Sequence, residues 1–194
     1  SAASDVYKRQ PYLRENIGMV LQEPFLFSRS ISENISIAGE EVDMAAVREA
    51  SRAACLDETV EGFTQGYDTF VGERGVTLSG GQKQRAAIAR TLMRRQPIMI
   101  FDDSLSAVDT ETDAKIRAEL ERRFGSASII LISHRITTLA KAGQILVLDK
   151  GRIAERGTHD ELVAANGIYR KIYDIQTAVS YTHLRAHETP EHLV

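Results

Sequence analysis

Apolar positions in this chain follow two spacings, which together predict strands interleaved with helices. Short apolar runs rich in β-branched residues occupy residues Ile17–Leu21, Ile98–Phe101 and Ile129–Ile132. Runs of this length with no polar face are typical of strands inside a parallel sheet. In residues Thr110–Phe124, by contrast, apolar residues recur at helical spacing. The pattern therefore predicts an α/β fold built on a parallel sheet.

The segment between the first two strands, about residues 23–95, carries helix and loop signals only. We expect its glycine-punctuated part, Thr64–Thr77, to be mostly loop. Asp43 is a good N-cap for the helix that follows it. The helices expected here are Ser32–Ile37, Met44–Ala54, Leu56–Phe63 and Ser79–Arg95. We interpret the segment as a helical subdomain inserted into the sheet.

Capping and turn signals organise the rest of the chain. Capping boxes are expected at Thr110-x-x-Asp113 and at Thr158-x-x-Glu161. The turn Asp149-Lys150-Gly151 predicts a hairpin between strands at residues 145–148 and 152–155. A last helix is expected over residues 168–175.

Composition narrows the class of protein. The 194 residues are 43% hydrophobic and 26% charged, with a formal net charge of −3. This balance gives no reason to expect a nucleic-acid partner. No apolar run approaches the roughly 20 residues of a membrane helix. The single cysteine, Cys55, excludes an internal disulfide, and we expect it to be a small buried side chain in a reducing compartment.

Three polar clusters are candidates for chemistry. Residues 78–82 read Leu-Ser-Gly-Gly-Gln at a helix start, which suits either a phosphate or an ordinary capping box. Asp102 and Asp103 end the second apolar strand, where carboxylates can bind Mg²⁺ or orient a water, or simply meet solvent. His134 follows the third strand, at the edge where α/β sheets place ligands, although a lone histidine is more often structural.

These clusters, together with Gln22 and the Ser-Ala-Val-Asp run at residues 106–109, resemble the ATP-binding cassette (ABC) ATPases. Residues 78–82 match the signature sequence of that family letter for letter. Gln22 resembles the Q-loop glutamine, and Asp102 the end of the Walker B strand. Residues 106–109 resemble the D-loop, and His134 the switch histidine. The resemblance covers about residues 11–176 and implies a P-loop NTPase-type fold.

The resemblance also implies a mechanism with ATP and Mg²⁺. In the family, two such domains close head to tail around two ATP molecules. The signature of one domain then contacts the ATP held by the other. Asp102 and Gln22 are expected to serve Mg²⁺, Asp102 through water, while Asp103 and His134 are the expected catalytic residues. The expected ATP-binding residues are Gln22, Ser79, Gly80, Gly81, Gln82, Asp102 and Asp109.

The chain departs from the family in two places. It contains no G-x-x-x-x-G-K-[ST] sequence, so the Walker A loop and its lysine are missing, and we expect the isolated fragment to be inactive. Asp103 stands where the family usually has glutamate, which sets its carboxylate back by roughly 1.5 Å. The aspartate, in a chain whose signature is intact, favours one half of a heterodimer with a degenerate site. The alternative is a homodimer that tolerates aspartate.

The resemblance to exporters implies a transmembrane domain as partner, contacted through about residues Thr69–Gly75 and Gln22. The implied location is the cytoplasmic face of the plasma membrane. Other ABC ATPases, of DNA maintenance or translation, are alternatives, but the chain has no sustained heptads and no basic face. An inactive fragment is a further alternative. Residues 1–10 and 177–194 do not continue the family pattern, and we interpret them as unassigned, of artefactual origin.

Overall fold

The computed structural model describes residues 2–37, 42–75 and 77–186. Its contacts divide the chain into two compact units, Ser1–Ile132 and Ser133–Val194. Each unit has a hydrophobic core of its own. Residues 187–194, part of the segment that we left unassigned, lie outside the described residues.

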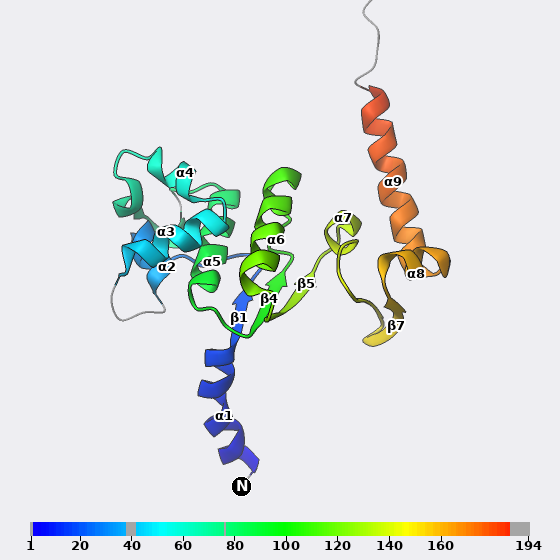
Figure 1. Cartoon of the computed structure of the whole chain (residues 1–194), viewed down its shortest axis with the longest axis horizontal. Helices are drawn as coiled ribbons and strands as arrows, with labels where there is room; N and C mark the ends of the chain where they lie inside the picture. The colour runs from blue at the N-terminus through cyan, green and yellow to red at the C-terminus, as the bar shows by residue number, and fades with distance from the viewer. Residues whose placement is uncertain (1, 38–41, 76, 187–194) are drawn as a thin grey trace, which may run out of the picture. The chain divides into compact units, whose positions relative to one another are not determined.

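A three-stranded parallel sheet forms the centre of the first unit and confirms the expected fold class (Figure 1). Its order is β1 (Ile17–Val20), β4 (Ile98–Asp102), β5 (Ser128–Ile132). In the register, Val20 lies beside Phe101 and Asp102 beside Ile132. The carboxyl ends of the strands therefore meet at one edge, next to the polar residues that follow β1 and β4.

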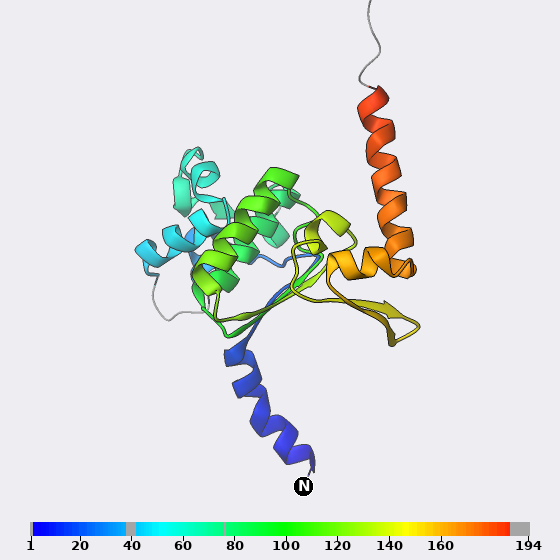
Figure 2. The ribbon, with the colours of Figure 1, turned by 45° about the vertical axis from the view of Figure 1, so that its right-hand side comes forward.

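Two helices, α5 (Gly80–Met93) and α6 (Thr110–Phe124), cover one face of this sheet, as the green ribbons of Figure 2 show. Val20, Met99 and Phe101 point into that face and are at most 1% exposed. They pack with apolar residues of both helices, among them Ile88 and Ile116. The core of the unit thus lies between the sheet and these helices.

The segment between β1 and α5 is largely helical, as expected. Asp43 caps its second helix by accepting hydrogen bonds from Ala45 and Ala46. The segment also contains a short antiparallel pair of strands, so our expectation of helix and loop only was wrong. Its elements are α2 (Ile31–Ser36), α3 (Met44–Ala53), α4 (Asp57–Glu61), the strands β2 (Arg29–Ser30) and β3 (Phe70–Val71), and the 3₁₀ turns η1 (Gly66–Asp68) and η2 (Glu73–Gly75).

Two helix starts differ from the sequence-based expectation. Helix α1 (Ala2–Asn16) precedes β1 where no periodic pattern was visible. The start of α6 is capped by Asp109, whose carboxylate accepts from the backbone N–H of Thr112, so the capping box expected at Thr110 is wrong. Asp113 instead pairs with Arg117 one turn further on. An aspartate one residue earlier competes for the cap because its short side chain reaches the same amides.

The second unit contains the expected hairpin and capped helix. Strands β6 (Ile145–Asp149) and β7 (Arg152–Gly157) pair across Lys150 and Gly151, which both have positive φ. Thr158 and Glu161 form the capping box of α8 (His159–Ala164). The short helix α7 (Ile136–Leu139) was not expected, and α9 (Ile168–Ala186) runs further than its pattern indicated.

Candidate functional site

The start of α5 combines a structural cap with an open helix end. Ser79 Oγ accepts from the backbone N–H of Gln82, and Gln82 Oε1 accepts from that of Ser79, at 3.3 and 2.8 Å. Ser79 and Gly80 are nevertheless exposed. A helix of 14 residues presents unpaired amides and the positive end of its dipole at this point. The capping box uses the N–H groups of Ser79 and Gln82. The helix start has further amides that can bind a phosphate, so both interpretations of residues 78–82 can hold at once.

Gly81 brings the signature start against the D-loop of the same chain. A Cβ atom built on Gly81 would lie 3.1 Å from the carbonyl oxygen of Ala107. No described atom would lie within 4 Å of a Cβ on Gly80. The two glycines therefore have different local roles. Gly81 allows two backbone segments of this unit to approach closely, whereas Gly80 leaves open space at the helix start.

The two adjacent carboxylates at the end of β4 differ in their backbone. Asp102 is the last residue of the strand and is half-buried. Asp103 has φ of 43°, a left-handed conformation that non-glycine residues adopt at a cost of roughly 1–3 kcal/mol. Its N–H donates to the carbonyl of Ile132 at 2.8 Å, and its carbonyl accepts from Ser106 Oγ at 2.6 Å. Strained backbone of this kind concentrates at functional sites.

Gln22 lies two residues beyond β1 and is exposed. The backbone around it is held by Gln84 of α5, which is 1% exposed. Gln84 Nε2 donates to the carbonyl oxygens of Leu21 and Gln22 at 3.2 and 3.4 Å. Helix α5 thus carries the signature residues at its start and fixes the Q-loop one turn later.

Asp109 has a local role in addition to any role in the family. Its carboxylate caps α6 through the N–H of Thr112 and also accepts from Thr112 Oγ1, at 2.9 and 2.7 Å. These hydrogen bonds lower the pKa of Asp109 below its usual value, because they favour the charged carboxylate. Asp109 therefore stays ionised while it is exposed at the end of the D-loop.

His134 lies near the start of the second unit and is exposed. Its carbonyl accepts from Gln176 Nε2 at 2.6 Å, and Gln176 Oε1 accepts from the N–H of Ile136 at 3.0 Å. Both hydrogen bonds come from α9 and hold the backbone on either side of Arg135. His134 thus stands on a loop that is fixed by its own unit.

The segment Thr69–Gly75 leads directly into the signature. Strand β3 pairs with β2, and the carbonyl of Gly75 accepts from the N–H of Leu78 at 2.9 Å. Phe70 in this segment is 57% exposed. An exposed aromatic side chain on an anchored segment is suited to contact with another protein surface.

Two residues that shape the site were missed in the sequence. Gln84 and Gln176 make their contacts with residues 62 and 42 positions away. A glutamine inside a helix looks like an exposed polar position unless its helical face is known. Gln84 does carry one signal, since Ala87 and Ile88, three and four residues later on the same face of the helix, are apolar.

Among the described residues, no group of three or more His, Cys, Asp or Glu side chains could hold a metal ion. None of the helices in that part of the chain is long and apolar enough to cross a membrane. Magnesium bound near Asp102 would therefore need further oxygen ligands, which phosphates commonly supply.

Comparison with known proteins agrees with the geometry. The family model described as ABC transporter matches residues 2–106, more than half of the chain. An uncharacterized ABC transporter ATP-binding protein of Bacillus subtilis is 48% identical over 164 residues, which are 84% of this chain and 28% of that protein. An ATP-dependent lipid A-core flippase of Cupriavidus pinatubonensis is 42% identical over 180 residues, 91% of this chain and 30% of the flippase.

A solved structure gives the same result. A bacterial Atm1-family ABC exporter with ATP bound aligns with a TM-score of 0.84 and 41% sequence identity. The alignment covers 86% of this chain and 30% of the exporter. The chain thus spans less than a third of the relatives that it matches.

Proposed function

The chain belongs to the ABC transporter family, and we propose that it forms part of the ATP-binding and hydrolysing domain of an exporter. The proposal draws on the exporters among its relatives, including the lipid A-core flippase and the Atm1-family protein. Because the chain covers less than a third of either, the activity of the whole protein is itself proposed. ATP binding and closure of two such domains would drive transport by an attached transmembrane domain.

The observation that carries this proposal is the close approach of the signature to the D-loop. Gly81 and the carbonyl of Ala107 are in close approach, and Gln84 fixes the backbone at Gln22. One helix therefore connects three motifs that the family uses around ATP. A change at the signature can then reach the Q-loop and D-loop through direct contacts.

The residues present fit Mg²⁺ and the phosphates of ATP. Asp102 ends β4 and Gln22 follows the adjacent parallel strand β1, and both offer hard oxygen ligands, which Mg²⁺ prefers. Ser79, Gly80, Gly81 and Gln82 present a helix N-terminus, which attracts phosphate. The bound nucleotide supplies the γ-phosphoryl group that water attacks. Asp103 would orient that water, and the proposed contact of His134 with the γ-phosphate rests on the family resemblance alone.

We propose that the signature serves a second nucleotide-binding domain, because Gly80 is exposed and a Cβ atom built on it would meet no described atom within 4 Å. Asp109 would communicate across that dimer. The transmembrane partner would contact Thr69–Gly75 and the Q-loop around Gln22, where Phe25 and Phe70 are 55% and 57% exposed. The location that we propose for the domain is the cytoplasmic face of the plasma membrane. One relative, a sub-family B protein of mouse, is described as mitochondrial.

The decisive variant is Gly80→Ala, made in a full-length transporter that contains this chain. Because the added methyl group meets open space, stability should be unchanged or raised by up to about 1 kcal/mol. ATPase turnover should fall by about 10²-fold, because the methyl group displaces the partner's phosphate. The matched control is Gly62→Ala, whose Cβ would make ordinary contacts at 3.5 Å. Equal turnover in both variants would contradict the proposed role of the signature.

We propose further that the 194-residue fragment alone does not bind ATP tightly or hydrolyse it. It lacks the Walker A sequence, whose amides and lysine supply most phosphate contacts in this fold. Isothermal titration calorimetry of the fragment with Mg²⁺-ATP should show no micromolar affinity. A micromolar dissociation constant would overturn this expectation.

We propose that this chain is one half of a heterodimer with a degenerate site, because Asp103 stands where the family usually has glutamate. The backbone of Asp103 is held on both sides, so the main chain has little freedom to make up for the shorter side chain. A carboxylate displaced by roughly 1.5 Å can lower turnover by about 10²-fold. Asp103→Glu in the full complex should therefore raise ATPase turnover at this site. Unchanged turnover in a working homodimer would favour the alternative that aspartate is tolerated.

A further inference from the structure

A cavity of about 460 Å³ lies away from the carboxyl edge of the sheet, between α3 and the C-terminal ends of α5 and α6. Its apolar lining includes Ala50, Leu92 and Phe124, which are at most 9% exposed. A volume of this size suits a small organic molecule, and such sites combine an apolar lining with a few polar groups. None of the motif residues discussed above lines it.

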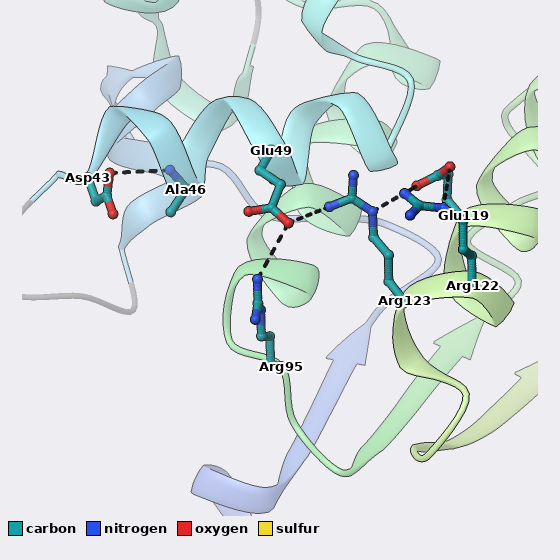
Figure 3. Close-up of polar contacts among 7 residues, drawn as sticks. All are labelled: Asp43, Ala46, Glu49, Arg95, Glu119, Arg122 and Arg123. Carbon is teal, nitrogen blue, oxygen red and sulfur yellow. Dashed lines mark hydrogen bonds and ion pairs between the residues drawn. The ribbon is translucent and has the colours of Figure 1, made fainter.

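The rim of this cavity carries an excess of positive charge. Glu49 of α3 pairs with Arg123 of α6 at 2.6 Å and with Arg95, just beyond α5, at 3.4 Å (Figure 3). Glu119 pairs with Arg122 and Arg123 at 2.7 and 2.8 Å. Three guanidinium groups thus face two carboxylates. Figure 3 shows the Glu49 carboxylate between arginines that come from two different elements.

Among these three arginines, Arg95 makes the weakest ion pair. Its side chain is 72% exposed, and its contact with Glu49 is the longest of these ion pairs. Its backbone has φ of 48°, at a position after a helix where glycine is usually preferred. Arg95 therefore keeps a left-handed backbone at a position where glycine would be unstrained. A guanidinium can donate two parallel N–H hydrogen bonds to one carboxylate, so Arg95 has donors available for a further anion.

The arginines also neutralise the negative ends of the α5 and α6 dipoles, and this alone could account for them. It does not account for the cavity that they border, whose lining is partly polar and partly apolar. An occupant that matches both features carries one negative charge and an apolar body.

We propose that this cavity binds a small amphiphilic carboxylate. Its carboxylate takes the place of Glu49 on Arg95 and Arg123. Its apolar body lies against Ala50, Leu92 and Phe124. The ligand competes with an internal carboxylate, so binding involves an exchange of ion pairs and no covalent step. The proposal is independent of ATP, because the cavity shares no residue with the proposed nucleotide site.

The test measures the binding of a probe, naphthalene-2-carboxylate, to the 194-residue chain by isothermal titration calorimetry. We expect a dissociation constant on the order of 0.1–1 mM, as for a ligand of this size. The neutral analogue naphthalene-2-carboxamide should bind about tenfold more weakly, because it lacks the charge that Arg95 recognises. Equal binding of acid and amide, or no binding of the acid at 10 mM, would overturn the proposal.

Three variants and a control locate the site, and each is first checked by circular dichroism and thermal unfolding. Glu49→Gln removes the internal competitor and should tighten binding about fivefold, whereas Arg95→Gln should weaken it about tenfold. Ala46→Phe fills the cavity from a half-buried position and should abolish binding. The matched control is Arg52→Gln, an exposed arginine of α3 that pairs with Asp57 outside the cavity, and its affinity should not change.

The direction of the Glu49→Gln effect is the sharpest criterion. If the cavity bound apolar probes without using charge, Glu49→Gln would leave the affinity unchanged. If the ion pairs of Glu49 only held the cavity together, their loss would weaken binding. Weaker or unchanged binding by Glu49→Gln therefore contradicts the exchange. Arg95→Lys keeps the charge without the fork and should lose less affinity than Arg95→Gln.

Discussion

The two faces of the β1–β4–β5 sheet differ in what covers them. On one face Val20, Met99 and Phe101 are almost completely buried under α5 and α6. On the other face Met19, Ile130 and Ile132 are 53%, 48% and 49% exposed. The residues alternate along the same strands, so both faces are apolar in sequence. The difference shows that half of this sheet's apolar surface has no counterpart among the described residues, and parallel sheets are usually covered on both faces.

The largest effect is expected on the covered face. Phe101→Ala should destabilise the chain by about 3–5 kcal/mol, because it leaves a cavity under two helices. Urea unfolding followed by circular dichroism measures this. Loss of less than about 1 kcal/mol would mean that the helices do not pack on the sheet as described.

A smaller effect is expected where α5 meets the end of β1. Gln84→Ala removes two hydrogen bonds to the carbonyls of Leu21 and Gln22 from a buried position. A hydrogen bond of this kind contributes about 0.5–1.5 kcal/mol, so we expect a loss of about 2 kcal/mol in urea unfolding. The control Gln65→Ala changes an exposed glutamine, and its stability should not differ from that of the wild type.

A substitution on the open face should destabilise this chain less than the two changes above, and should destabilise a longer chain more. Ile130→Ser should cost less than about 1 kcal/mol here, because the side chain is already half in water. If an upstream segment covers this face in the full protein, the same change should cost about 2–3 kcal/mol there. Comparing the two denaturation midpoints measures the difference. Equal costs in both chains would argue against a covering segment.

The smallest effect is expected at the start of α6, where the Asp109 cap makes stability depend on pH. The pKa of Asp109 is lowered by Thr112, so its charged form is stabilised by folding. This contribution is present above the unfolded pKa near 3.9 and is lost as pH falls through the lower folded pKa. Asp109→Asn keeps a capping oxygen without the charge. Thermal unfolding from pH 6 to pH 2 should therefore depend less on pH in this variant, and an unchanged dependence would exclude Asp109 as its source.

Local signals in the sequence were sufficient for most of the framework. The strands ending at Asp102 and Ile132, the caps at Ser79 and Thr158, and the turn at Lys150 and Gly151 all depend on residues within a few positions of one another. Propensity, capping and turn geometry act over this range, so they can be read along the chain. The order of the motifs likewise identified the family.

The tertiary structure decided what those elements bring together. That Gly81 meets Ala107, that Gln84 holds the Q-loop, and that Glu49 lies between Arg95 and Arg123 follow from packing between elements far apart in the chain. Contacts of this kind depend on which faces of helices and strands meet. The free energy that selects those faces comes from burying the whole core, and no single stretch of sequence contains it.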